Sequence, residues 1–392
     1  MDAGGGLVVE SGTIVEIIPA GQRPILSCSR VFDASRHVVL PGLINTHHHF
    51  YQTLTRAFSK ALNKKLFPWL KSLYPVWARL DEQAIAVSSQ LAAAELLLSG
   101  CTTAADHHYI FPSRVPHALD VQVEAIKNTG IRANLTRGSM SLGEDQGGLP
   151  PRNTVQDEQT ILRDSERVIR QYHDSRHGSA MQIALAPCSP FSVSEELMRE
   201  SARLARQHQV RLHTHLAETE DETAYCLSMF GVRPVDYLER VDWLAEDVWL
   251  AHGIHFNDEE IRRLGGAGVG ISHCASSNMV LASGFCRTLE LERAGCAVGL
   301  GVDGSASNDC SNLVQEARQA FLLQRLHYGA SEVSHLDALR WATTGSAACL
   351  GRKDVGWIDT GMCADLALFK LDELRFSGSD DPLAALLLCG AH

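Results

Sequence analysis

Residues 41–50 read Pro-Gly-Leu-Ile-Asn-Thr-His-His-His-Phe and directly follow the apolar run Val38-Val39-Leu40. Successive side chains of a strand point to opposite faces, so on a strand His47 and His49 would share one face and His48 would take the other. Two imidazoles on one face form half of a metal site. The alternative is a histidine cluster that is hydrogen-bonded to the backbone of a loop. The choice between the two depends on further ligands elsewhere in the chain.

Composition narrows the class of protein. The chain has 392 residues, of which 45% are hydrophobic and 21% charged, which is typical of a globular protein with one large domain and a smaller one. The formal net charge of -11 argues against a nucleic-acid partner, which would need a basic surface. No run approaches membrane-spanning length and no signal-peptide pattern is visible, so we expect neither a membrane span nor a signal peptide. Its 11 cysteines are scattered without a CxxC pair, which indicates free thiols and predicts a cytoplasmic protein.

Short apolar strands alternate with amphipathic helical patterns along most of the chain. This alternation predicts an α/β fold, a parallel (β/α)8 barrel of the TIM type. The expected strands are Val39–His49, Thr102–His107, Arg132–Arg137, Gln182–Cys188, Val210–Glu218, Val248–His252, Val269–His273 and Ala297–Asp303. We therefore expect residues 39–360 to form the barrel and residues 1–38 and 361–392 to form a small β-sandwich domain from both chain ends.

Polar residues gather at the carboxyl ends of the expected strands, which is the active-site face of such a barrel. The fifth strand ends with His213, His215 and Glu218, the sixth with His252, and the eighth with Asp303. Any single histidine of this kind could be a hydrogen-bonded core residue. Several strand ends in register favour a site in which histidines and one carboxylate bind Zn²⁺ or Fe²⁺ and leave one position open for water.

The order of the motifs PGLINTHHHF, HTHLAET, WLAHGIHF, HCASSN and LGVDGSASND resembles the amidohydrolase superfamily, in its branch of nucleobase and heterocycle aminohydrolases. The resemblance covers essentially the whole chain. It implies that His47, His49, His215 and Asp303 bind the metal, that Glu218 moves protons, and that His252 forms a hydrogen bond beside the attacking water. His213 would lie one layer deeper. The fourth strand lacks the lysine that bridges two metals in some relatives, which implies a single ion, with zinc expected and iron as the alternative.

The stretches HHHFYQTLTRA, ADHHY, TRGSMSLGE and APCSPFSVSEELM are most similar to those of family members that deaminate 8-oxoguanine. The resemblance implies a hydrolase acting on carbon–nitrogen bonds other than peptide bonds. In this reaction, hydroxide generated at the metal attacks the ring carbon that bears the amine, and 8-oxoguanine becomes urate and ammonia. Deamination of hydroxylated s-triazines, guanine or isocytosine remains an alternative, and a non-catalytic barrel is a more distant one.

Substrate contacts and assembly complete the expectations. The expected contacts to the heterocycle come from side chains near the strand ends, namely Gln52, His107, Arg137 and Cys188.

We expect a homo-oligomer that binds neither nucleic acid nor membrane. Typical relatives extend beyond both ends of this chain, so we also expect the small domain to be incomplete, with unpaired strand edges.

Overall fold

The computed structural model describes residues 4–390, and its centre is a closed barrel of eight parallel strands. Around the barrel the strands follow the order β10-β11-β4-β5-β6-β7-β8-β9. Their bounds are β4 Leu43–Asn45, β5 Cys101–His108, β6 Arg132–Ser139, β7 Met181–Pro187, β8 Leu212–Leu216, β9 Val248–His252, β10 Gly270–His273 and β11 Ala297–Leu300. The expected barrel is therefore confirmed.

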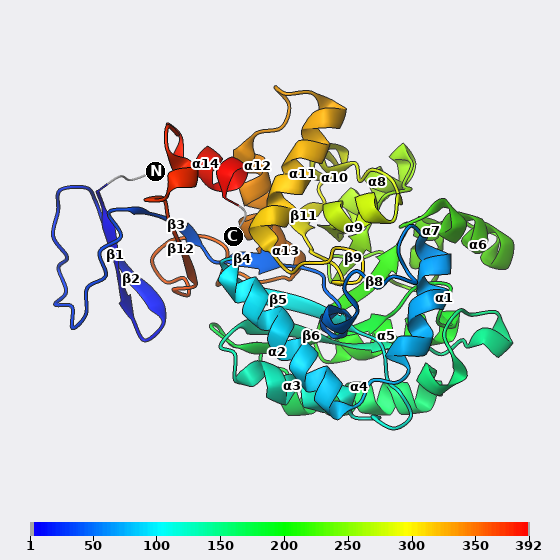
Figure 1. Cartoon of the computed structure of the whole chain (residues 1–392). Coiled ribbons are helices and arrows are strands. Elements are labelled where there is room, and N and C mark those ends of the chain that lie inside the picture. The colour runs from blue at the N-terminus through cyan, green and yellow to red at the C-terminus, as the bar shows by residue number, and fades with distance from the viewer. Residues whose placement is uncertain (1–3, 391–392) are drawn as a thin grey trace.

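Helices surround the barrel on its outside (Figure 1). They are α1 Leu66–Trp77, α2 Glu82–Leu98, α3 Ala118–Lys127, α4 Glu158–Tyr172, α5 Glu195–Gln207, α6 Glu220–Phe230, α7 Pro234–Arg240, α8 Asp258–Gly266, α9 Ala275–Val280, α10 Thr288–Ala294, α11 Leu313–Tyr328, α12 His335–Arg340, α13 Ser346–Cys349 and α14 Pro382–Cys389. A 3-10 helix, η1 Phe50–Thr55, follows the histidine stretch, and a π-helical turn, Trp341–Gly345, joins α12 to α13. Within residues 4–390, no helix is both long and apolar enough to cross a membrane.

The apolar run before the histidines belongs to a different sheet from the one expected. Strand β3 (His37–Pro41) pairs antiparallel with β12 (Leu366–Lys370), and the barrel begins only at β4, beyond Gly42. Pro41 has no N–H to continue the pairing. A Cβ on Gly42 would lie 2.0 Å from Thr102 Oγ1, so only glycine fits at this crossing. The first barrel strand is therefore Leu43–Asn45 rather than Val39–His49, and the domain boundary expected at residues 38 and 39 falls inside β3.

The chain ends do not form the expected β-sandwich within the described residues. Strands β1 (Gly6–Glu10) and β2 (Thr13–Ile18) form one two-stranded sheet, β3 and β12 form another, and a single bridge between Thr13 and Cys363 links them. Helix α14 packs against α11 and α12 of the barrel layer instead of adding a strand. The expectation for residues 1–3 and 391–392 lies outside the described residues.

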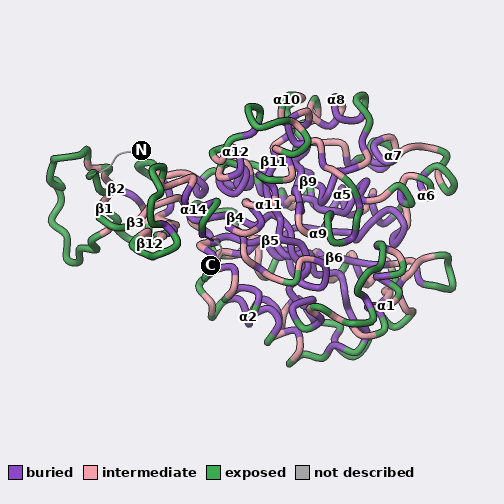
Figure 2. The backbone as a smooth tube through the Cα atoms, turned by 45° about the horizontal axis from the view of Figure 1, so that its top comes forward, coloured by how far each residue is buried: buried purple, intermediate pink, exposed green. Residues whose placement is uncertain are grey.

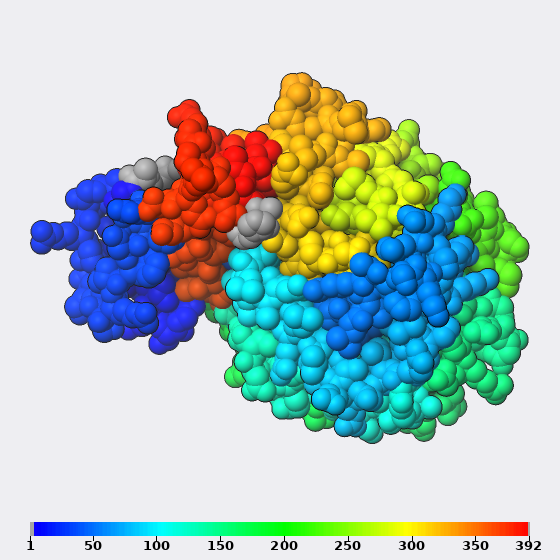
Figure 3. Space-filling view, in the orientation of Figure 1, coloured from blue at the N-terminus to red at the C-terminus, as the bar shows by residue number. Residues whose placement is uncertain are grey.

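Burial separates the two parts of the chain. The barrel strands are almost continuously buried, whereas most residues of the hairpin of β1 and β2 are exposed or half-buried and the segment 19–36 is mostly exposed (Figure 2). In the space-filling view the hairpin forms a lobe beside the rounded barrel (Figure 3). The apolar core, and with it every expected site residue, lies in the barrel.

Candidate metal centre and active site

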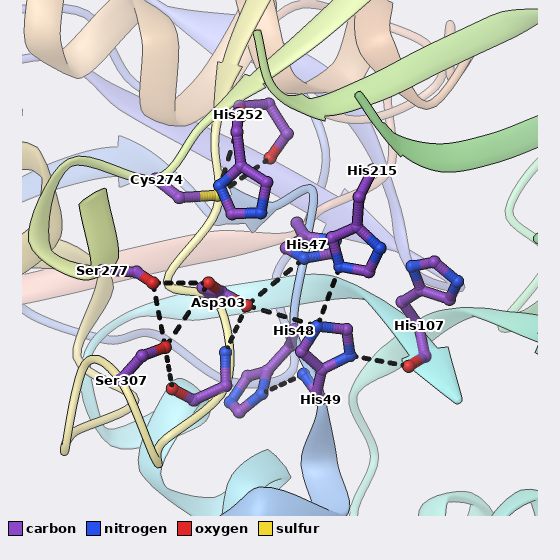
Figure 4. A network of polar contacts seen from close by, with 12 residues as sticks. His47, His48, His49, His107, His215, His252, Cys274, Ser277, Asp303 and Ser307 are labelled. Carbon is purple, nitrogen blue, oxygen red and sulfur yellow. Dashed lines mark hydrogen bonds and ion pairs between the residues drawn. The ribbon is translucent and has the colours of Figure 1, made fainter. Parts of the chain in front are cut away.

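The predicted metal ligands meet at the carboxyl end of the barrel (Figure 4). His47 and His49 follow β4, His215 lies in β8, and Asp303 follows β11. Asp303 Oδ1 lies 3.3 Å from both His47 Nε2 and His49 Nε2. His49 Nε2 lies 3.2 Å from His215 Nε2. Two ligand atoms that are each about 2.1 Å from one ion can be at most about 4.2 Å apart, so these spacings allow coordination of one ion.

Hydrogen bonds fix the tautomer of each ligand histidine. The Nδ1–H groups of His49 and His215 donate to the carbonyls of His107 and Cys188, both at 2.7 Å. His213 Nδ1–H donates to the Trp249 carbonyl at 2.8 Å, so His213 Nε2 must accept from His47 Nδ1–H, also at 2.8 Å. All three ligand histidines are then protonated at Nδ1 and present a bare Nε2 lone pair.

The donors fit a divalent cation in their chemistry as well as their spacing. His47 Nε2 is buried and has no hydrogen-bond partner within residues 4–390, so its lone pair is available to a metal ion. Burial lowers the pKa of His47 and of His215 well below the usual value, so both rings are neutral and able to coordinate. Two groups of potential ligands overlap at His47, one with His49, His107 and His215 and the other with His252 and Asp303. Together they contain the four predicted ligands.

Asp303 is held as a carboxylate by its surroundings. Burial alone would raise its pKa, but the polar groups around the carboxylate, first among them the His47 ring at 3.3 Å, outweigh burial and lower the pKa of Asp303 well below the usual value. Ser277 Oγ donates to Oδ2 at 2.6 Å, and the Gly304 N–H donates to Oδ1 at 2.7 Å. These two hydrogen bonds therefore fix the orientation of the Asp303 carboxylate.

Glu218 and His252 stand beside the ligands and face the same cavity. His252 Nε2 lies 3.5 Å from Glu218 Oε2, and both side chains are buried. The amide nitrogen of Asn278 lies 3.0 Å from His252 Nδ1, so Nδ1 accepts and the ring carries its proton on Nε2. This is the reverse of the ligand histidines and makes His252 a donor toward the cavity. Burial raises the pKa of Glu218 well above the usual value, and the carboxylates of Asp303 and Glu222 raise it further.

Three of the strand ends that carry these groups have an uncommon backbone. Ala217, His252 and Asp303 have φ values of 54°, 76° and 61°, in the left-handed region that non-glycine residues rarely occupy. Such conformations persist only where the surrounding structure enforces them, and they cluster at functional sites.

The cavity above the donors has an apolar and aromatic wall that sequence reasoning missed. Helix α1 and the neighbouring loops supply this wall, which consists of Leu66, Trp69, Leu70, Tyr74, Tyr109 and Phe191. Trp69 Nε1–H donates to the Ala306 carbonyl at 3.2 Å and so ties α1 to the loop after Asp303. The signal in the sequence was the long connection between the first two barrel strands, in which an aromatic-rich amphipathic helix precedes α2.

Of the four expected substrate contacts, the structure brings two to the cavity. Gln52 and Cys188 line it, and Gln52 Oε1 is buried without a hydrogen-bond partner in the described chain. A Cβ on Gly304 would lie 1.9 Å from that oxygen, so the Gln52 amide packs directly against the residue after Asp303.

The other two expected contacts lie elsewhere. His107 stacks on His215 with ring centroids 4.6 Å apart and bonds the Ala186 carbonyl through Nε2 at 2.9 Å, which places it behind the ligands rather than in the cavity. Arg137 points away from the barrel axis. Its Nε donates to Asp164 at 2.7 Å, and its guanidinium lies 3.8 Å from the Phe111 ring centroid. The expectation that His107 and Arg137 contact substrate is corrected accordingly.

Comparison with known proteins gives a consistent result. Residues 38–387 match the amidohydrolase family. The chain is 66% identical over 391 residues to the 8-oxoguanine deaminase of Pseudomonas aeruginosa, covering 100% of this chain and 87% of that protein. It is 39% identical over 351 residues to the hydroxydechloroatrazine ethylaminohydrolase of Pseudomonas sp. strain ADP, covering 87% and 72%. The zinc complex of atrazine chlorohydrolase TrzN from Arthrobacter aurescens TC1 superposes with a TM-score of 0.94 at 32% identity, covering 98% and 86%.

Proposed function

Since this chain belongs to the amidohydrolase family and is a hydrolase acting on carbon–nitrogen bonds, we propose that it deaminates an oxidised purine, 8-oxoguanine. Water replaces the amino group on the ring carbon, and the products are urate and ammonia. The observation that carries the proposal is the convergence of His47, His49, His215 and Asp303 with Glu218 and His252 at one cavity, in a chain 66% identical to a protein of that activity.

We propose zinc as the metal, because imidazole nitrogens and carboxylate oxygens are both common zinc ligands and a structural relative was solved with zinc. His47, His49, His215 and Asp303 would hold it. When bound, the ion lowers the pKa of water toward 7 and so supplies hydroxide at neutral pH.

The chain's own residues account for the proton movements. The raised pKa of Glu218 favours its protonated form, which can deliver a proton to a ring nitrogen as the amine-bearing carbon becomes tetrahedral. His252 Nε2–H faces the cavity and can donate to the attacking oxygen as negative charge develops there. Asp303 can receive the first proton that water loses and pass it to the departing ammonia. The hydroxyl proton of the tetrahedral carbon can return to Glu218 as the carbonyl forms, which restores the acid.

The cavity wall suits a flat heterocycle with polar edges. Trp69, Tyr74, Tyr109 and Phe191 offer aromatic faces and edges to a planar ring. Gln52 Oε1, which is buried and unpaired among the described residues, can accept a hydrogen bond from a ring N–H. Cys188 contributes an apolar contact, because burial raises the pKa of its thiol to about 12 and keeps it neutral.

The proposal is tested by measuring ammonia release from 8-oxoguanine, guanine, isocytosine and hydroxylated s-triazines with zinc-loaded protein. We expect 8-oxoguanine to have the highest kcat/KM. A second candidate, aminohydrolysis of hydroxylated s-triazines, is favoured by the 39% identical ethylaminohydrolase and by the triazine hydrolase superposition. Turnover of triazines without turnover of 8-oxoguanine would replace the first candidate by the second.

A further inference from the structure

A second buried glutamate lies directly behind Glu218. The Glu222 side chain, on the first turn of α6, is 1% exposed and does not line the cavity. Its Oε1 accepts the Ala217 N–H at 2.9 Å, and its Oε2 accepts the Glu218 N–H at 3.2 Å. Both carboxylate oxygens are therefore bonded to the backbone of the turn that presents Glu218.

That turn needs support of this kind. Ala217 has a left-handed backbone, which reverses the chain between β8 and α6 and aims Glu218 toward His252. The Ala217 carbonyl accepts the N–H groups of Ile254 and His255, each at 2.9 Å, so the loop after β9 holds one side of the turn. Glu222 holds the other side, where the two N–H groups would otherwise be buried without partners.

Glu222 has no other partner that would explain its burial. In the described part of the chain it forms no ion pair with a cation, and the two hydrogen bonds it accepts come from the backbone N–H groups named above. An isolated buried carboxyl is unfavourable unless a local gain offsets its desolvation. Here the hydrogen bonds to the Ala217 and Glu218 N–H groups offset that cost, and they also fix the turn that presents the Glu218 side chain.

Two other buried carboxylates act on active-site loops in the same way. Asp106 accepts the N–H of Phe50, the residue after His49, at 2.6 Å. Glu316 accepts the N–H of Ser276 at 3.0 Å, next to the serine that bonds Asp303. Each supports the backbone beside a functional residue, whereas Glu222 also bonds the N–H of Glu218 itself.

We propose that Glu222 is a positioning residue that sets the orientation of the Glu218 carboxyl for proton transfer. The inference rests on the proposed function, because it assigns Glu222 an effect only through Glu218. A glutamine at position 222 can still accept one N–H but turns its NH₂ group toward the other, so it retains the volume and loses half of the support.

The test compares Glu222→Gln with Glu220→Gln, an exposed residue of the same helical turn, in zinc-loaded protein. We expect Glu222→Gln to lower kcat by about 10- to 100-fold while KM and zinc content stay close to wild type, since misdirected proton transfer affects the chemical step. Glu220→Gln should leave kcat unchanged. If the glutamine variant does not fold, Glu222→Asp is measured in its place. It keeps the charge but is too short to reach both N–H groups, so the same loss of kcat is expected.

A double-mutant cycle with Glu218→Gln separates positioning from a general structural role. If Glu222 acts through Glu218, its replacement costs no further activity once Glu218 is glutamine. An equal loss in both backgrounds, or an unchanged kcat in Glu222→Gln, overturns the inference. The cycle is run on whichever substrate of the ammonia-release panel the wild-type protein turns over, so failure on 8-oxoguanine counts against the proposed function and not against Glu222.

Discussion

The carboxyl end of the barrel and the two small sheets at the chain ends differ in strand pairing and in burial. In the barrel, every strand has two neighbours, and the polar site residues are buried and held by hydrogen bonds to their neighbours. In the β1–β2 sheet each strand pairs with one neighbour, and the adjoining segment 19–36 is largely exposed. Histidine and carboxylate groups with shifted pKa values need desolvation and fixed partners, which the barrel supplies and an open hairpin cannot. We therefore expect substitutions of the buried site residues in the barrel to lower activity strongly, and substitutions in the exposed end sheets to change it little.

The largest effect is expected from removing a metal ligand. His215→Ala deletes an Nε2 that lies 3.2 Å from His49 Nε2, and the remaining donors cannot complete the coordination. We expect zinc to fall well below one ion per chain and kcat/KM to fall at least about 1,000-fold. Metal analysis of purified protein and ammonia release measure the two quantities. His177→Ala, an exposed histidine outside the site, is the matched control. Full zinc occupancy in His215→Ala would remove His215 from the proposed ligands.

The next effect separates proton transfer from metal binding. Glu218→Gln keeps the size of the side chain but cannot deliver a proton, so we expect kcat to fall by about 100- to 10,000-fold while zinc stays bound. Zinc content and steady-state kinetics measured on the same preparation give both quantities. A variant with near-wild-type kcat would exclude Glu218 from proton transfer.

A smaller effect is expected from the residue behind His47. His213 Nε2 accepts the Nδ1–H of His47 at 2.8 Å, so His213→Leu leaves that ring without its orienting partner. Loss of such a partner typically weakens metal affinity by about 10- to 100-fold. Competition with a chelator of known affinity measures the change. An unchanged affinity would mean that the packing of the ring alone orients His47.

Stability of the metal-free protein should depend on pH through the same buried groups. Burial lowers the pKa of nine barrel histidines, namely His47, His48, His49, His107, His108, His213, His215, His252 and His273. In the unfolded chain each of these histidines has a pKa of about 6.5. As the pH falls below that value, the unfolded chain takes up protons that the folded chain does not, so the folded state loses stability. Burial raises the pKa of four carboxyls, Asp106, Glu218, Glu222 and Glu316, which act in the opposite direction.

Because the histidines outnumber these carboxyls, we expect the free energy of unfolding to decrease as the pH is lowered from 6.5 toward 4. Each net proton taken up on unfolding contributes about 1.4 kcal/mol per pH unit. Urea unfolding of the apoprotein at a series of pH values measures the slope. Equal or greater stability at pH 5 than at pH 7 would contradict the neutral state of the buried histidines.

The comparison also explains which parts of the site could be predicted from the sequence. His215, His252 and Asp303 were predictable because parallel strands end at the same edge of a barrel, so polar residues that close apolar runs must converge. The position of Arg137 follows from the alternation of side chains along its strand. In the parallel register Arg137 is paired with His108 and Thr136 with His107, so Arg137 points outward with His108 and packs on Phe111.

Other features depend on tertiary contacts that no local pattern contains. The left-handed backbone of Ala217 follows from hydrogen bonds with Glu222, Ile254 and His255, and alanine has no intrinsic preference for it. The place of Val38–Leu40 in a sheet with β12 depends on a strand more than 300 residues away in sequence. A run of apolar residues predicts a strand, but it does not identify the partner of that strand.

The smallest effect on activity and stability is expected from a substitution in the exposed segment after β2, outside the barrel. Ile25 lies in the segment after β2 with 90% of its surface exposed, and its backbone N–H donates to Glu16 at 3.0 Å. Ile25→Ser keeps that bond and removes an apolar side chain that packs against little. Exposed substitutions of this kind change stability by less than about 0.5 kcal/mol. We therefore expect kcat, KM and zinc content to equal those of the wild type and Tm to change by no more than about 2 °C. A changed kcat would show that this exposed segment is coupled to the cavity, and the division between a functional barrel and functionally silent end sheets would then fail.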